Sequence, residues 1–309
     1  MILHSACWMA LLLAADDRPP PADDLATVAT AFARGPKAIV SGVAKVTQRT
    51  VGPNGRGAIE IKCDASFADN KERFVFEYSP EAAAHMLDFP RTKLIFLYDG
   101  TACMTVAYSD HIAPAGCEAI VDADPKLAES QAGIALVKGM PRIAIWFPRG
   151  LGPISADAFE ASRRDDGLVQ LTSRTVGPKR TQVLADPVAG FNIVRATSTY
   201  PKSGTETVRE AKWRQRGDVW CVERISHTTS KAGVLEERWE LEYTDFKPNV
   251  EVDASTFTVA SLKLPTNARI VDLRTAEQRN NYSAAPPAND PTLTVARYLE
   301  DLAKGVAPK

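Results

Sequence analysis

Residues of the kind that perform catalysis are sparse in this chain and widely separated. The four histidines are His4, His85, His111 and His227, and long stretches of sequence lie between most of them. A Gly-x-Ser-x-Gly turn, which exposes the serine nucleophile of many hydrolases, does not occur. A nucleophile needs a neighbouring base, and no pattern in the sequence indicates one. Hydrolysis is therefore less favoured than either of the two functions considered below.

One short segment contains side chains that could bind a metal ion, namely Cys103, Asp110, His111 and Cys117. Structural zinc sites favour closely spaced cysteine pairs separated by two residues, and the sequence has no such pair. We therefore expect no metal site. A disulfide between Cys103 and Cys117, which flank a loop with a proline and a glycine, or buried free thiols explain these cysteines better.

Two further patterns have simple structural explanations. Gly52, Gly55 and Gly57 lack the Lys-Ser or Lys-Thr and the helix of a phosphate-binding loop, so they are predicted to lie in a hairpin turn. Lys212, Arg214 and Arg216 follow one face of a predicted strand, with Trp213 on the other. These charges could contact lipid head groups or a partner, but alternation places them opposite the core, on a solvated outer face.

Large apolar side chains are more informative. Phe74, Phe76 and Tyr78 alternate along one strand and share one face, where they line either an apolar cavity or an ordinary core. Trp146 and Phe147, beside a Gly/Pro loop, would form a hydrophobic lid or pack against the sheet. The predicted cavity-lining residues are Phe74, Phe76, Tyr78, Phe96, Trp146 and Phe147.

The spacing of apolar residues changes from helical to alternating after the first predicted helix. Residues 22–35 place Leu25, Val28 and Phe32 at helical spacing. From residue 39 the pattern alternates, which predicts antiparallel strands with one apolar face and one polar face toward water. Asp99-Gly100 predicts a hairpin turn. The strands of this first block are predicted at residues 39–49, 58–63, 73–78, 93–98 and 102–108.

A less regular middle segment precedes a second strand block. Residues 124–138 predict a helix with Pro125 in its first turn, and a Gly/Pro loop follows at 149–153. We expect this insertion to act as a movable cover. Strands of the second block are predicted at residues 168–175, 181–184, 191–199, 207–216, 219–228 and 235–246.

Composition and the amino terminus indicate export. The 309 residues have a formal net charge of −1, so no global field attracts nucleic acid or an anionic membrane. Residues 6–15 form a short apolar core ending in small residues, as in a secretory signal, although residues 1–5 contain no Lys or Arg. A disordered or membrane-tethering tail is the alternative. No later segment reaches the roughly 18 apolar residues of a membrane-spanning helix.

Four segments are therefore predicted: a signal peptide at 1–15, a proline-rich spacer at 16–21, one folded domain at 22–274, and a polar linker with a carboxy-terminal helix at 275–309. Removal of the signal peptide would leave four cysteines, an even number that permits two disulfides in any of three connectivities. The mature chain is expected to be periplasmic or otherwise extracytoplasmic.

The order of these elements resembles that of the LolA-like superfamily of outer-membrane lipoprotein carriers. The resemblance lies in the helix at Leu25–Phe32, the strand at Phe74–Tyr78, the Asp99-Gly100 turn and the strand block at 167–247. Asp218–Cys221 is similar to the tryptophan-bearing strand of larger, uncharacterised relatives. Residues 246–250, 253–257 and 264–272 are similar to their carboxy-terminal run.

The resemblance implies an α+β fold, in which an incomplete antiparallel β-barrel wraps around the amino-terminal helix under a helical lid segment. It also implies an apolar cavity and a lipid or acylated protein as partner. The chain is longer than the type member of the superfamily. The latch arginine of that protein has no clear counterpart here, since Arg49 and Arg73 are candidates by location only.

The leading hypothesis is a non-enzymatic envelope protein that binds a lipid or a lipoprotein acyl chain, with no cofactor and no nucleic acid partner. The alternative is a periplasmic sensor or protein-interaction module that carries no lipid and uses the outer face or edge of the sheet for an envelope protein partner.

Overall fold

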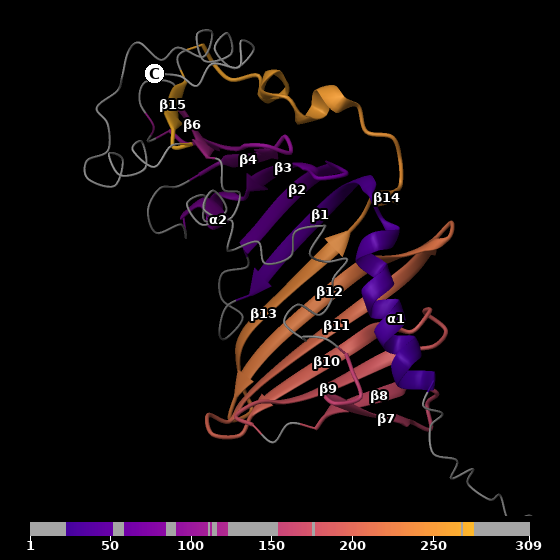
Figure 1. Ribbon diagram of the computed structural model, residues 1–309. Coiled ribbons are helices and arrows are strands. Elements are labelled where there is room, and N and C mark those ends of the chain that lie inside the picture. The colour runs from indigo at the N-terminus through magenta and orange to yellow at the C-terminus, as the bar shows by residue number, and fades with distance from the viewer. Residues whose placement is uncertain are drawn as a thin grey trace, which may run out of the picture.

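One curved antiparallel sheet forms most of the structure (Figure 1). The computed structural model describes residues 23–51, 59–84, 91–110, 112, 116–122, 154–174, 177–266 and 268–274. The strand order is β15-β6-β5-β4-β3-β2-β1-β13-β12-β11-β10-β9-β8-β7, and β14 also pairs with β1. Only the pairing of β15 with β6 is parallel among the described strands. Since β15 and β7 end this path without pairing to each other, the sheet stays open as a half-barrel.

The two strand blocks predicted from the sequence fall in the two halves of this sheet, but the strands at 117–122 and 159–163 were not predicted. The first half contains β1 (Ser41–Val51), β2 (Ile59–Ala68), β3 (Lys71–Tyr78), β4 (Lys93–Tyr98), β5 (Cys103–Tyr108) and β6 (Cys117–Asp122), with the short helix α2 (Pro80–Ala84). The second half contains β7 (Phe159–Arg163), β8 (Val169–Ser173), β9 (Arg180–Asp186), β10 (Asn192–Tyr200), β11 (Thr205–Arg216), β12 (Val219–Lys231) and β13 (Val234–Tyr243). The chain then forms β14 (Lys247–Pro248), the 3₁₀ helices η3 (Ala254–Phe257) and η4 (Val259–Leu262), and β15 (Arg269–Asp272).

The halves are joined where β1 pairs with β13. Val46 lies opposite Tyr243 in this ladder and Val51 lies opposite Arg238. Because residues directly opposite each other share a face of the sheet, Val46 and Tyr243 continue one apolar face from the first half into the second. Both side chains are buried.

The helix predicted at 22–35 corresponds to α1 (Asp23–Ala38). It runs along the second half of the sheet, and its main contacts are with β7, β10 and β12 (Figure 1). Val28 is fully buried against the sheet, and Leu25 and Phe32 are half-buried there. This helical spacing of apolar residues explains why one side of α1 faces the sheet.

The predicted Asp99-Gly100 hairpin turn is confirmed between β4 and β5. The Asp99 carboxylate accepts hydrogen bonds from the backbone N–H groups of Thr101 and Ala102, at 2.8 and 2.9 Å. Gly100 has φ +100°, a conformation that a residue with a Cβ rarely adopts. The turn therefore follows from its two residue types.

The expectation of one apolar and one polar face is correct in the middle of the sheet but wrong for β4. Leu94, Ile95, Phe96 and Leu97 are consecutive and all buried. Ile95 and Leu97 pack in a second core with residues of the carboxy-terminal segment, including Phe257. Since this segment covers the outer face, β4 is apolar on both sides.

Several predicted segments lie outside the described residues: the signal peptide at 1–15, the spacer at 16–21, the helix at 124–138, the loop at 149–153 and the tail at 275–309. In the part of the chain that the structure describes, no helix is both long and apolar enough to cross a membrane.

Candidate functional site

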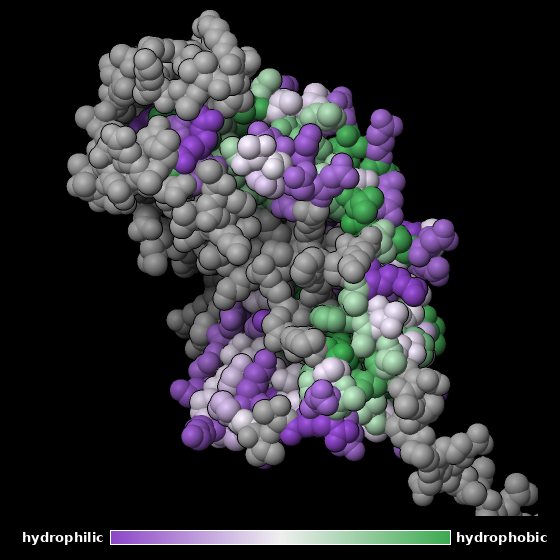
Figure 2. All heavy atoms as spheres, in the orientation of Figure 1, coloured by the Kyte–Doolittle hydropathy of each residue, from purple (hydrophilic) through white to green (hydrophobic). Residues whose placement is uncertain are grey.

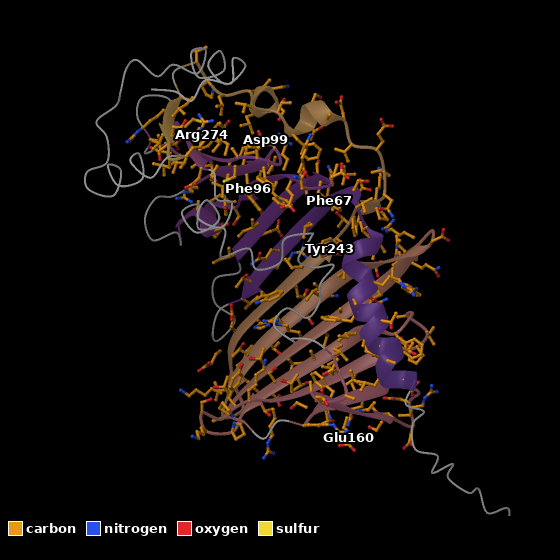
Figure 3. All side chains as sticks on the ribbon, viewed as in Figure 1. Phe67, Phe96, Asp99, Glu160, Tyr243 and Arg274 are labelled. Carbon is orange, nitrogen blue, oxygen red and sulfur yellow. The ribbon has the colours of Figure 1, made fainter. Side chains whose placement is uncertain are left out.

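The inner face of the sheet, on which α1 packs, carries one continuous apolar cluster, called here the inner-face cluster. Its buried members come from β1 to β5 and from β7 to β13. Figure 3 labels three of them, Phe67 on β2, Phe96 on β4 and Tyr243 on β13. Phe246, which follows β13, lies 6.4 Å from Phe67 and 6.2 Å from Tyr243 between ring centroids. This pair of aromatic contacts spans the seam between the two halves.

Three of the predicted cavity-lining residues lie together in this cluster. Phe74 and Phe76 on β3 and Phe96 on β4 are at most 2% exposed. The ring centroid of Phe74 lies 6.2 Å from that of Phe76 and 6.1 Å from that of Phe96. These distances are typical of favourable aromatic pairs. We call this set the phenylalanine row.

The other predicted cavity residues have different outcomes. Tyr78 is half-buried and packs against the cluster. Burial raises the pKa of Tyr78 to about 12, so its phenol is neutral at physiological pH. Trp146 and Phe147 lie outside the described residues. A role in ligand binding remains a prediction for all six residues.

The amino terminus of α1 is held to the edge of the sheet. The Asp24 carboxylate accepts hydrogen bonds from Nε and Nη2 of Arg163 on β7, at 2.6 and 2.8 Å. The hydrogen bond to Asp24 raises the pKa of Arg163 further. Bidentate pairs of this kind fix orientation as well as distance, so Arg163 positions α1 over the inner face.

The predicted disulfide between Cys103 and Cys117 is not present, and the sheet register explains why. Cys103 lies opposite Asp122 at one end of the β5–β6 ladder, whereas Cys117 lies opposite Tyr108 at the other end. Opposite ends of a six-residue strand are about 17 Å apart, far beyond disulfide reach. Cys63, Cys103, Cys117 and Cys221 are all buried free thiols.

Burial lowers the reactivity of three of these thiols. Burial raises the pKa of Cys117 and of Cys221 to about 11, and that of Cys63 still further. The thiolate form, which is the nucleophile and the metal ligand, is therefore scarce at neutral pH. Within the described ranges, no group of three or more His, Cys, Asp or Glu residues could hold a metal ion.

His227 has structural partners that its isolated position in the sequence did not reveal. Arg209 Nε donates a hydrogen bond to His227 Nδ1 at 3.1 Å, and His227 Nε2 lies 3.0 Å from Thr229 Oγ1. Since arginine only donates, Nδ1 must accept, which places the ring proton on Nε2. The ring also stacks on Trp239, with 4.7 Å between centroids. Its only lone pair is thus occupied, so His227 is not an available base in this arrangement.

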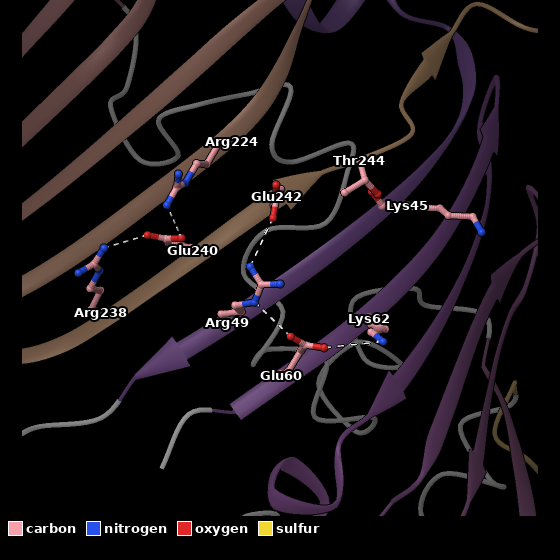
Figure 4. Close-up of polar contacts among 9 residues, drawn as sticks. All are labelled: Lys45, Arg49, Glu60, Lys62, Arg224, Arg238, Glu240, Glu242 and Thr244. Atoms are coloured by element: carbon pink, nitrogen blue, oxygen red, sulfur yellow. Dashed lines mark hydrogen bonds and ion pairs between the residues drawn. The ribbon is translucent and has the colours of Figure 1, made fainter. Parts of the chain in front are cut away.

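The outer face is polar where the carboxy-terminal segment does not cover it (Figure 4). Glu240 accepts hydrogen bonds from Arg224 at 2.6 Å and Arg238 at 2.9 Å. Arg49 pairs with Glu60 at 3.1 Å and Glu242 at 3.4 Å. A groove of about 380 Å³ on this face is lined by Glu210, Ala211, Lys212, Arg224, Ser226, Thr228, Arg238 and Glu240. Each charge in its lining has a partner of opposite sign, either within the lining or, for Lys212 and Glu210, in Glu223 and Arg195 beside it, so the groove favours neither an anion nor a cation.

The predicted separation of basic residues from Trp213 is confirmed. Lys212 and Arg214 both form ion pairs with Glu223. Trp213 packs against the inner-face cluster and donates a hydrogen bond to the carbonyl oxygen of Ile193 at 2.9 Å. The apolar inner face is therefore the stronger candidate for ligand binding.

No protein-family model matches the chain, and no curated protein matches it. Three solved structures are similar to it in fold. A LolA superfamily protein from Nitrosomonas europaea has 12% identity and a TM-score of 0.40, covering 76% of this chain and 99% of that protein. A putative outer membrane lipoprotein-sorting protein domain from Vibrio parahaemolyticus has 11% identity and a TM-score of 0.40, covering 75% and 97%.

The third is a DUF1329 family protein from Desulfovibrio piger, with 8% identity and a TM-score of 0.38, covering 77% of this chain and 99% of that protein. At these identities and scores, nothing about ligand, partner or activity follows from the likeness. The first of the three is from the LolA superfamily, which the sequence pattern resembles.

Proposed function

We propose that this protein binds the acyl chain of a lipid or of an acylated protein between α1 and the inner face of the sheet. It would act without catalysis, as a carrier in the bacterial envelope. The observation that carries this proposal is the extent of the inner-face cluster, which continues across both halves of the sheet, whereas the main contacts of α1 are with β7, β10 and β12.

Two apolar surfaces would form the walls of the site. Leu25 and Phe32 belong to the α1 wall, and the sheet wall is the inner-face cluster. The phenylalanine row extends this cluster over the half of the sheet that α1 does not chiefly contact. Figure 2 shows hydrophobic residues gathered on the side of the molecule where α1 lies in Figure 1. A flexible acyl chain fits a site of this type because it needs apolar contact rather than directed hydrogen bonds.

The magnitudes favour weak and reversible binding. Burial of one methylene group contributes about 0.8 kcal/mol, so about ten methylenes would contribute about 8 kcal/mol. Association and chain ordering cost several kcal/mol of this sum. A single acyl chain could therefore bind reversibly without any charged contact, which is what a carrier requires.

The absence of catalysis in this proposal is supported by the chemistry of the described residues. The thiols of Cys117 and Cys221 are protonated at neutral pH, and both ring nitrogens of His227 have hydrogen-bonding partners. The envelope location is supported by the apolar core at residues 6–15 followed by two aspartates.

Native mass spectrometry of the chain purified from envelope extracts tests the proposal. Retained lipids or fatty acids should be released on denaturation, and the emptied protein should take up a fluorescent long-chain fatty acid. The exposed Arg34→Ala variant should bind this probe like the unaltered chain, whereas Phe32→Ala on the same helix should bind it about tenfold more weakly.

Two results would contradict acyl-chain binding. One is a protein that never carries a lipid and does not take up the probe. The other is equal probe affinity of the Phe32→Ala and Arg34→Ala variants, which would place the probe away from α1. A stable protein partner together with no ligand uptake would instead favour an interaction module.

A further inference from the structure

Exposed apolar side chains gather on two neighbouring turns at one end of the sheet. Tyr200 is 36% exposed at the β10–β11 turn, and Val234 and Leu235 are 65% and 39% exposed after the β12–β13 turn. Both turns lie at the lower left of Figure 1. Large apolar side chains that are exposed close together at one end of a sheet are candidates for a binding surface.

Hydrogen bonds hold the two turns together as one unit, called here the hairpin tip and comprising residues 200–205 and 231–235. The backbone N–H of Ala232 donates to the carbonyl oxygen of Gly204 at 2.9 Å, from one turn to the other. Within the first turn, the N–H groups of Ser203 and Gly204 both donate to the carbonyl oxygen of Tyr200. The exposed apolar side chains are therefore presented on a fixed backbone.

The charges of the hairpin tip are basic. Lys202 and Lys231 are exposed within the two turns. The nearest acidic residues, Glu206, Glu236 and Glu237, lie beyond the turns, along β11 and β13. Glu206 lies in the same cross-strand row as Leu235, one row behind Tyr200, Lys231 and Val234. An approaching surface would therefore meet these three side chains and Lys202 before the carboxylates. The charge is thus local and does not depend on the net charge of the whole chain.

We propose that the hairpin tip docks onto an anionic lipid surface. Apolar side chains that enter the headgroup region, together with lysines that attract anionic lipids, are the two usual contributions to reversible membrane binding. The area offered by two short turns is small beside the roughly 800 Å² per partner of a stable protein interface. A lipid surface places no such demand on area.

The position of the tip relates this docking to the inner face. Tyr200 lies opposite Thr205, Thr205 opposite Lys231, and Lys231 opposite Val234. This row has the same parity along β10 and β11 as the buried Ala196 and Ala211, so it is the last row of the inner face. Docking would bring one end of the inner face against the lipid. The docking itself goes beyond the proposed function and does not require an acyl chain in the site.

Hydrogen–deuterium exchange of the full chain, with and without vesicles of equal parts phosphatidylcholine and phosphatidylglycerol, locates any contact along the sequence. Amides of residues 200–206 and 231–236 should exchange severalfold more slowly with these vesicles than without them. Residues 186–191, the β9–β10 turn at the opposite end of the sheet, should exchange at an unchanged rate. Vesicles of phosphatidylcholine alone should give a weaker effect.

Matched variants separate the tip from other membrane contacts. The double variant Val234→Asp with Leu235→Asp should lose the slowed exchange. Val188→Asp should retain it, because Val188 is 86% exposed but lies in the opposite turn. Replacement of Lys202 and Lys231 by Gln should weaken vesicle binding through the tip about 25-fold, since each lysine near the surface contributes about fivefold.

The same charge change on the outer face, with Lys45 and Lys62 replaced by Gln, should alter this binding by less than about twofold.

The proposal is overturned if saturating anionic vesicles leave exchange in the hairpin tip unchanged. It is equally overturned if the Val234→Asp, Leu235→Asp variant retains the slowing, or if Val188→Asp abolishes it. Loss of fatty-acid uptake with intact tip protection would contradict the acyl-chain proposal alone.

Discussion

The carboxylate of Asp24 on α1 is paired in bidentate fashion with the guanidinium of Arg163 on β7, the last strand of the sheet. The Asp24 side chain is 5% exposed and that of Arg163 is 53% exposed. The guanidinium therefore approaches the buried carboxylate from the solvent side. Because α1 and the inner face would form the two walls of the proposed site, this pair governs how firmly the walls are held together.

Asp24→Asn should loosen α1. A neutral amide cannot accept both hydrogen bonds as a charged partner, so the variant should unfold at lower urea concentration and should exchange a bound fluorescent fatty acid about threefold faster or more. The control is Asp166→Asn, whose partner Arg164 lies two residues away in an exposed turn. Equal exchange rates in the two variants would show that Asp24 does not restrain α1.

The phenylalanine row should contribute strongly to stability. Phe76→Ala and Phe96→Ala each remove a ring that is at most 2% exposed, and each should lower the free energy of unfolding by about 3–5 kcal/mol. Val188→Ala, at an 86% exposed position, should change it by less than about 0.5 kcal/mol. Urea denaturation measures all three. Losses below about 1 kcal/mol at Phe76 and Phe96 would mean that the rings are not packed as described.

The buried cysteines should be free and unreactive. Since burial raises the pKa of Cys117 and Cys221 to about 11, their labelling by iodoacetamide should stay slow between pH 7 and pH 9 and become fast only in denaturant. Peptide mapping without reduction should detect Cys103 and Cys117 as separate thiols. A cross-linked peptide containing both would contradict the β5–β6 register.

The Arg224–Glu240–Arg238 cluster should make stability depend on acid pH. Burial raises the pKa of Glu240, but hydrogen bonds from Arg224 and Arg238 lower it more, so the folded-state pKa lies below the ordinary value of 4.5. Such a group stabilises the folded protein above the unfolded-state pKa, and this contribution is lost as pH falls through the folded-state pKa.

Glu240→Gln should therefore reduce the free energy of unfolding by about 1 kcal/mol at pH 7 and by progressively less below pH 4.5. Urea denaturation at several pH values measures the difference. Glu242→Gln is the control, because its side chain is 50% exposed and its contact with Arg49 is longer, at 3.4 Å. A Glu240→Gln effect that stays constant from pH 7 to pH 3 would contradict this linkage.

The local sequence pattern was enough to predict many of the strands. The predicted strand at 191–199 corresponds to β10, that at 207–216 lies within β11, and that at 219–228 lies within β12. Alternation encodes such strands because each buries only one face. The Asp99-Gly100 turn was predictable for a similar reason, since its conformation depends on its own two residues.

Features that depend on distant segments were not predictable in this way. Ile95 and Leu97 lie on the outer face of β4 and are buried there by a segment around Phe257, which follows more than 150 residues later in the chain. The disulfide prediction considered the loop between Cys103 and Cys117 but not the register of the strands that flank it. The pair of Asp24 with Arg163 joins residues 139 positions apart, and neither residue belongs to a recognisable motif.

Of the candidate site, the sequence identified the phenylalanine row because alternation assigns Phe74 and Phe76 to one face. It did not identify the partners of His227, since Arg209 and Trp239 come from two neighbouring strands whose register is set by hairpin turns. Trp146 and Phe147 remain predictions.

Photo-crosslinking from the inner face tests the central claim most directly. Phe32 and Arg34 lie on opposite sides of α1, half-buried and exposed respectively. With p-benzoylphenylalanine in place of Phe32, irradiation in envelope extracts should attach a lipid or an acyl-bearing peptide, identified by mass spectrometry. The same replacement of Arg34 should attach neither. Equal capture from the two positions, or no acyl-containing adduct from position 32 in a folded protein, would contradict the account.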